Sequence, residues 1–254
     1  MGIAEILQSY NLSLLKWVAI AIAAFVLGLS KSGIKGIGII IILILAFVFG
    51  EKASTGILLP MLISADVLAV SYYNRHAQWK FIKLLLPWMV IGVLVGVWVG
   101  DAISEVLFKQ VMAIIVISSV LIMWYFEKRK STTVPQNKVF SSSMGFLSGF
   151  TTMVGNLAGP VSNIYFLAMR LPKNQFIGTA AWLFFIINVF KLPFHFFVWK
   201  TVSKDTLVLN LILFPVVAIG FFMGARVVKL ISNAKYRHFI IIVTAIGGII
   251  MLFR

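Results

Sequence analysis

Ten apolar segments follow one another along almost the whole chain, and they restrict what this chain can fold into. The segments are 12–29, 36–50, 54–74, 81–100, 106–126, 139–153, 157–170, 175–198, 206–225 and 236–253. A helix needs about 20 apolar residues to cross a bilayer, and most of the segments approach that length. Only 11% of the residues are charged, whereas a soluble domain has about 25%. We therefore predict an all-α integral membrane protein with no separate soluble domain.

A glycine-rich stretch from Gly28 to Gly38 interrupts the first two apolar segments. It holds Lys31 and Lys35, together with two serines and four glycines. Irregular backbone and charge persist at membrane depth only where protein buries them or where they line a watery cavity. A second interruption, Gly155-Asn156, occupies the corresponding place in the other half of the chain. Paired interruptions of this kind indicate the binding site of a transporter.

Glycine and proline positions indicate an internal repeat. Two glycines recur 122 residues later and one proline-glycine pattern recurs 128 residues later; the pairs are Gly33/Gly155, Gly56/Gly178, Pro87/Pro215, Gly92/Gly220 and Gly96/Gly224. An odd number of crossings per half predicts an inverted repeat of two five-segment halves. We place the first repeat at 1–130, a polar linker at 131–138 and the second repeat at 139–254. We call the two interruptions, Gly28 to Gly38 and Gly155-Asn156, the first and the second break. The short segments beside them are either thin membrane spans or arms of broken, hairpin helices.

The charge distribution predicts an orientation. The net charge is +15, but the basic residues lie mostly in short loops, which is typical of membrane topology and not of nucleic-acid binding. The loops that contain Arg75, Lys128 and Arg226 are the richer in lysine and arginine. The positive-inside rule places these loops in the cytoplasm and both termini outside the cell membrane.

Several kinds of chemistry find no support in the sequence. The chain contains no cysteine, and its histidines, His76, His195 and His238, lack metal-ligand spacing. No phosphate-binding loop or dinucleotide fingerprint occurs. We therefore expect no metal, no cofactor and no enzymatic activity, and we expect energy to come from ion or substrate gradients.

Three features resemble a known family. They are the Gly-Leu-Ser-Lys-Ser-Gly run at 28–33, the Gly-Phe-Leu-Ser-Gly run at 145–149, and the two-fold repeat. Together they resemble the TauE/SafE sulfite exporter family over nearly the whole chain. The resemblance implies a small multi-span carrier that moves sulfite, sulfonates and related sulfur-containing anions, usually outward.

The candidate substrate-binding residues gather at the two breaks. They are Lys31, Ser32, Gly33, Lys35, Gly36, Gly155, Asn156 and Asn163. An oxyanion needs positive potential and hydrogen-bond donors, which ammonium groups, hydroxyls and the N-termini of helices beginning near Gly36 and Leu157 provide. In the competing interpretation, both lysines lie in a short cytoplasmic turn and extend to lipid headgroups. The repeat and the resemblance favour binding for Lys31 and leave Lys35 open.

A second group of residues is a candidate for coupling or gating: Asp66, Asn188 and His195. Asp66 is the only acid deep inside an apolar segment, where a carboxylate is costly unless it is paired or hydrated. It carries a coupled proton or it pairs structurally with Lys31. Asn188 is its counterpart in the repeat, and Lys191 and His195 follow on the same helical face. Lys191 faces the substrate or the lipid, and His195 either titrates or packs at an interface.

These observations predict a secondary transporter for small sulfur-containing anions such as sulfite or sulfoacetate, acting across the cytoplasmic membrane, with proton coupling as one of the two roles open to Asp66. Its expected partners are the anion and the lipid bilayer. Two alternatives stay open at this stage, an anion channel that uses the same basic break and a membrane assembly factor that transports nothing. The sequence leaves open the identity of the anion, the coupling ion and the oligomeric state.

Overall fold

The computed structural model describes residues 10–102, 110, 114, 117, 118, 121, 122, 124, 125 and 138–252. These residues form helices only: α2 (Leu14–Lys31), α3 (Gly38–Phe49), α4 (Glu51–Tyr73), η1 (Asn74–His76), α5 (Trp79–Ala102), α7 (Lys138–Gly155), α8 (Ala158–Ala168), α9 (Lys173–Pro193), the π-helical turn η2 (Phe194–Val198), α10 (Lys204–Leu230) and α11 (Asn233–Leu252). The predicted all-α fold is confirmed for this part of the chain. The expected segment 106–126 falls mostly outside the described residues, as does most of the polar linker.

Five of the helices are long and apolar enough to cross a membrane. They are Leu14–Lys31, Lys52–His76, Trp79–Gly100, Lys173–Val198 and Lys204–Leu230. By contrast, α3 has 12 residues and α8 has 11. At 1.5 Å per residue such helices extend only about 18 Å, which is short of the roughly 30 Å hydrocarbon core. The two helices that follow the breaks are therefore too short to span a bilayer on their own.

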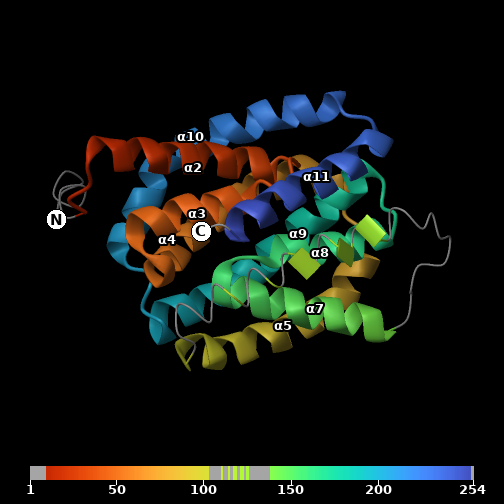
Figure 1. Cartoon of the computed structure of the whole chain (residues 1–254), viewed down its shortest axis with the longest axis horizontal. Helices are drawn as coiled ribbons and strands as arrows, with labels where there is room; N and C mark the ends of the chain where they lie inside the picture. Colours follow the sequence, from red (N-terminus) through yellow and green to blue (C-terminus); the bar gives the residue numbers. More distant parts are fainter. Residues whose placement is uncertain are drawn as a thin grey trace.

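Two helix pairs form opposite edges of the molecule, α2 with α10 and α5 with α7 (Figure 1). Each pair joins a helix of the first half to a helix of the second. A methyl group at Gly28 of α2 would lie 2.0 Å from the carbonyl oxygen of Val217 in α10. In the other pair, a methyl group at Gly149 of α7 would lie 2.0 Å from the carbonyl oxygen of Met89 in α5. Both pairs therefore pack backbone against backbone, as small residues allow in membrane helices.

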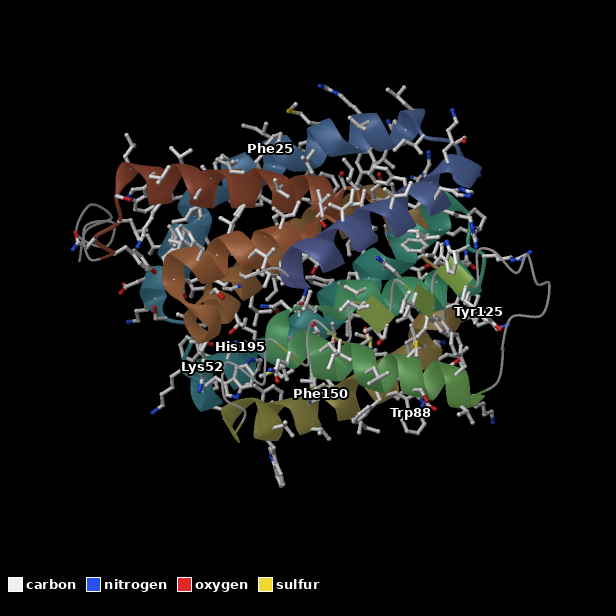
Figure 2. The ribbon with its side chains drawn as sticks, viewed as in Figure 1. Phe25, Lys52, Trp88, Tyr125, Phe150 and His195 are labelled. Atoms are coloured by element: carbon white, nitrogen blue, oxygen red, sulfur yellow. The ribbon has the colours of Figure 1, made fainter. Side chains whose placement is uncertain are left out.

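The repeated glycines of α5 and α10 contribute to the same contacts. A methyl group at Gly92 would approach the carbonyl oxygen of Phe146 to 2.1 Å, and one at Gly220 would approach that of Phe25 to 2.2 Å. Figure 2 shows Phe25 at the α2–α10 edge and Phe150 at the α5–α7 edge. The two edges are thus built by corresponding residues of the two halves.

Helices α4 and α9 pack together between these edges. Their repeated glycines contact corresponding regions of the other half. Gly56 of α4 lies against the carbonyl oxygen of Thr201, which follows η2, and Gly178 of α9 lies against that of Tyr73 at the end of α4. This close pairing brings Asp66 of α4 next to Asn188 of α9. Two polar residues of the candidate site therefore meet where α4 and α9 pack together.

We predict that Gly28→Ala and Gly149→Ala each destabilise the protein by about 1–3 kcal/mol, because the added methyl group forces a well-packed helix pair apart. Thermal unfolding of detergent-solubilised protein measures the effect. Gly159→Ala is the matched control, since no atom lies within 4 Å of the position of its added methyl group. Unfolding midpoints for both edge variants equal to that of the control would contradict backbone-to-backbone packing.

Candidate functional site

The first break joins the end of α2 to the start of α3. Gly33 has φ +125° and Gly36 has φ +101°, conformations that glycine adopts readily and other residues rarely do. The carbonyl oxygen of Ser32 accepts a hydrogen bond of 2.8 Å from the Tyr73 hydroxyl, and that of Gly33 accepts one of 2.7 Å from the Tyr236 hydroxyl. Protein groups therefore satisfy the irregular backbone, as a break inside a membrane protein requires.

The second break joins α7 to α8 and turns at Asn156. Its φ is +56°, in the left-handed region that asparagine tolerates better than most residues. The backbone N–H of Asn156 donates to the carbonyl oxygen of Thr152 at 3.0 Å, and its side-chain Nδ2 donates to the carbonyl oxygen of Thr55 at 3.2 Å. Thr55 belongs to α4, so the second break is tied to a helix of the first half.

A buried ion pair connects the first break to α4. The Nζ atom of Lys31 lies 2.6 Å from Oδ1 of Asp66, and Asp66 is completely buried. The second carboxylate oxygen, Oδ2, accepts a hydrogen bond of 2.7 Å from Nδ2 of Asn188. Of the two roles expected for Asp66, the structure displays the pairing with Lys31. A buried charge needs such partners, because removing it from water costs several kcal/mol.

Lys191 of α9 points into the protein and not toward lipid. Its side chain is completely buried, and Nζ donates to Oδ1 of Asn156 at 2.6 Å and to Oγ1 of Thr152 at 3.1 Å. A third contact, of 3.5 Å, reaches Oδ1 of Asn188. Polar contacts therefore run without interruption from Lys31 through Asp66, Asn188 and Lys191 to the second break.

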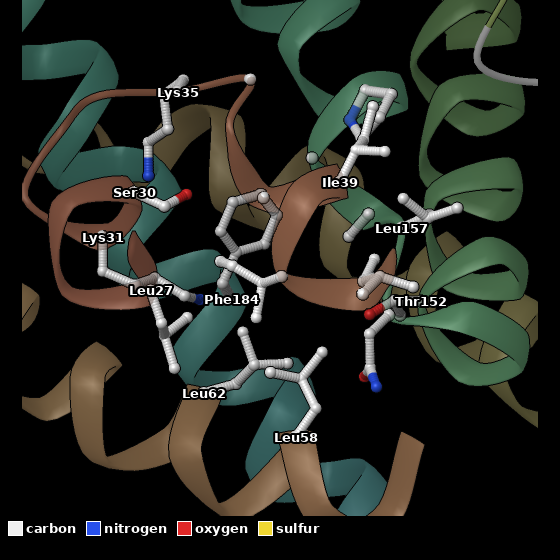
Figure 3. A pocket seen from close by; sticks show the side chains of 18 of the residues that line it. Leu27, Ser30, Lys31, Lys35, Ile39, Leu58, Leu62, Thr152, Leu157 and Phe184 are labelled. Carbon is white, nitrogen blue, oxygen red and sulfur yellow. The ribbon is translucent and has the colours of Figure 1, made fainter. Parts of the chain in front are cut away.

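A cavity of about 80 Å³ lies between the two breaks. A buried water needs about 10–15 Å³ of such space, so the cavity has room for a small hydrated or partly dehydrated ion. In Figure 3, Lys31 and Lys35 lie on one side of it, Thr152 and Leu157 on the other, and Phe184 between them. Leu58 and Leu62 of α4 form an apolar part of the wall. The wall therefore combines two cations with largely apolar surroundings.

Lys35 is the cation of the cavity without a carboxylate partner in the described part of the chain. Only 6% of its surface is exposed, and the ion pair of Lys31 with Asp66 does not include it. Its Nζ lies 5.7 Å from the centre of the Phe184 ring, and that of Lys31 lies 5.2 Å from the same centre. A cation near an aromatic face is weakly stabilised. Lys35 therefore presents to the cavity a basic group that no carboxylate of the described residues pairs with.

Two helix N-termini open onto the cavity, as expected from the sequence. Gly38 and Ile39 of α3 line it from one side, and Ala158 and Gly159 of α8 line it from the other. Helix N-termini carry unsatisfied N–H groups and a partial positive charge. Asn163 of α8 also lines the cavity, and its buried Oδ1 has no hydrogen-bond partner among the described residues. That carboxamide is not committed to any neighbour and can turn its NH₂ group toward a ligand.

The structure divides the predicted site residues into two groups. Lys31, Lys35, Gly36, Asn156, Asn163 and Asn188 line the cavity. Ser32, Gly33, Gly155, Asp66 and His195 lie outside its described wall. The Ser32 hydroxyl donates to the carbonyl oxygen of Leu29 at 2.7 Å, and Nδ1 of the fully buried His195 lies 2.9 Å from Oγ1 of Thr201.

Four further residues of the site were not among the candidate binding or coupling residues, although Lys191 was noted as facing the substrate or the lipid. Ser30, Thr152 and Phe184 line the cavity, and Lys191 lies directly behind it. The sequence signal for Lys191 was its three-residue spacing from Asn188, which places both residues on one helical face. No sequence signal pointed to Phe184, because an aromatic residue on an apolar helix is usually part of the core.

A family model described as sulfite exporter TauE/SafE matches residues 20–251. The matched stretch contains both breaks and every residue of the cavity wall. No curated protein and no solved structure matches the chain significantly.

Asp66→Asn is expected to destabilise the protein by about 3–5 kcal/mol, because it leaves the buried ammonium group of Lys31 without its counter-ion. The double variant Lys31→Met/Asp66→Asn removes both charges and should recover most of this loss. Unfolding midpoints of the wild type, both single variants and the double variant complete the cycle. Equal stability of Asp66→Asn and the wild type would show that the ion pair contributes nothing.

Proposed function

The chain belongs to the sulfite exporter TauE/SafE family, and we propose that it exports small sulfur-containing anions across the cytoplasmic membrane. Sulfite, sulfonates such as sulfoacetate, and related oxyanions are the proposed substrates. Membership in a family of membrane transporters agrees with the five long apolar helices of a multi-pass membrane protein. The proposal is a secondary transporter, driven by gradients of its substrate and of coupled ions.

The main support for this proposal is that both breaks line the same cavity. Two helix N-termini, the unpaired ammonium group of Lys35 and the uncommitted amide of Asn163 converge there. Preorganised donors of this kind replace the hydration shell of an anion, and discontinuous helices supply them in other secondary transporters. In this proposal Lys31, Lys35, Gly36, Asn156 and Asn163 bind the anion, while Ser32, Gly33 and Gly155 shape the backbone of the breaks.

An inverted repeat provides a route to alternating access. The reciprocal pairs α2–α10 and α5–α7 support a two-fold relation between 1–130 and 139–254, joined by 131–138. The loops richest in lysine and arginine then face the cytoplasm, and both termini lie outside. Movement of the edge pairs against α4 and α9 would expose the cavity to one side of the membrane and then to the other.

Asp66 is the proposed coupling residue. Protonation of its carboxylate would weaken the ion pair with Lys31 and free that ammonium group to face the anion. Asn188 holds the second carboxylate oxygen and would transmit the change to α9. Protons would in this way control how much positive charge the cavity offers.

Purified protein in liposomes should take up sulfite in a saturable way, and substrate on the opposite side should stimulate the uptake. Lys35→Met should lower the apparent affinity at least about tenfold, because it removes an uncompensated buried charge next to the anion. It should leave the unfolding midpoint nearly unchanged, since Lys35 has no ion-pair partner in the described residues. The exposed Lys80→Met is the matched control.

Two outcomes contradict the transporter. Anion conductance without stimulation by substrate on the opposite side would indicate a channel. Flux no greater than that of empty liposomes, for sulfite, thiosulfate, sulfate, sulfoacetate and taurine alike, would indicate a protein that does not transport.

A pH gradient across the liposome membrane should change the initial rate of sulfite uptake by the wild type. Asp66→Asn, compared at equal amounts of folded protein, should lose this response because its side chain cannot exchange a proton. Size-exclusion chromatography establishes the folded amount. An undiminished response to the gradient in this variant would assign coupling to another residue and leave Asp66 a structural role.

A further inference from the structure

We propose that Lys191 sets the charge preference of this site, so that doubly charged anions are favoured over singly charged ones. The inference rests on the proposed anion site and adds a residue that lies behind the cavity wall. Lys191 acts as a positioning residue, because it contacts Asn156 and Asn188, which line the cavity, and does not line the cavity itself.

The hydrogen-bond partners of Lys191 suit an ammonium group, whereas its complete burial opposes the charge. An ammonium group has three donors and no acceptor, and Nζ faces three side-chain oxygen atoms, from Asn156, Thr152 and Asn188. All three are neutral, and no carboxylate of the described residues lies within ion-pair distance of Lys191. Burial of a cation with neutral partners alone is costly. We therefore infer that the molecule bound in the cavity compensates the cost of burying this lysine.

The charges around the cavity do not balance. The charged and titratable groups that act on Lys191 are Lys31 and Asp66 from other elements and His195, four residues on in η2; Lys35 lines the same cavity. Asp66 is the carboxylate of this group, and it is paired with Lys31. Two basic side chains, those of Lys35 and Lys191, are left without a counter-ion among the described residues. A bound anion favours protonation of both amines, and two negative charges then restore neutrality, whereas one does not.

The hydrogen bonds of Lys191 also orient the wall. Because the amide oxygens of Asn156 and Asn188 face Nζ, their NH₂ groups point elsewhere, that of Asn156 to the carbonyl oxygen of Thr55 and that of Asn188 to Asp66. Lys191 thereby holds both amides in one orientation.

The other half of the chain shows that the fold does not need a lysine here. Asp66 and Asn188 are 122 residues apart and bond to one another, and the same offset relates Lys191 to Ala69. Ala69 is buried in the apolar core of α4. Alanine therefore meets the packing requirement at the corresponding position, and the cation in α9 is an addition to the repeated scaffold.

The experiment compares sulfate with methanesulfonate, which share a tetrahedral sulfur head but carry two charges and one. Dissociation constants are measured by calorimetry on purified wild type, Lys191→Met and Lys191→Arg. We expect the wild type to bind sulfate more tightly than methanesulfonate. Lys191→Met should weaken sulfate binding roughly tenfold more than methanesulfonate binding, because one lost positive charge costs a dianion twice as much as a monoanion. Lys191→Arg should keep the wild-type ratio.

Lys173→Met is the matched control. Its ammonium group is partly buried, whereas that of Lys191 is completely buried, and it donates to the carbonyl oxygens of Val228 and Ile231, away from the cavity. This variant should lower stability without moving the sulfate-to-methanesulfonate ratio.

The outcomes separate the two proposals. Equal weakening of both anions by Lys191→Met would assign Lys191 a purely structural role and overturn the inference, while the anion site would stand. If Lys191→Met does not fold, the wild-type ratio decides, since a wild type that binds methanesulfonate as tightly as sulfate overturns the inference as well. Failure of the wild type to bind either anion overturns both the inference and the anion site.

Discussion

A carboxylate buried between α4 and α9 connects the parts of the candidate site. Asp66 cannot remain charged in apolar surroundings without partners, and it obtains them from Lys31 of the first break and Asn188 of α9. Asn188 in turn contacts Lys191, which binds Asn156 of the second break. The need to compensate one charge therefore fixes the relative position of both breaks and of the cavity between them.

The first break has two faces with different tasks. Its carbonyl oxygens at Ser32 and Gly33 point to the hydroxyl groups of Tyr73 and Tyr236, whereas the side chain of Lys35 points to the cavity. A carbonyl oxygen repels an anion, so turning these groups away leaves mainly positive and neutral groups around the cavity. Neither Ser32 nor Gly33 lines the cavity, and their carbonyl groups bond to the two tyrosine hydroxyls.

Most of the helices could be predicted from the sequence, because long apolar runs and the glycines between them have few other interpretations in a membrane protein. The meeting of the two breaks followed from the repeat. The pairing of Asp66 with Lys31 was one of two expected roles for that acid. The sequence could not predict whether the side chain of Lys191 faces lipid or protein, because α9 is apolar on nearly every side. Phe184 was missed for the same reason.

Helices of the first half pack against helices of the second half, and this packing has a consequence for the synthesis of the protein. The ribosome releases the chain from its N-terminus, so α2 enters the membrane long before α10, against whose backbone Gly28 packs. In the same way α5 precedes α7, which supplies Gly149. The nascent first half therefore carries two helix surfaces whose partners have not yet been translated. Its assembly must wait for the last helices, and during that time the translocation machinery or lipid has to cover these glycine surfaces.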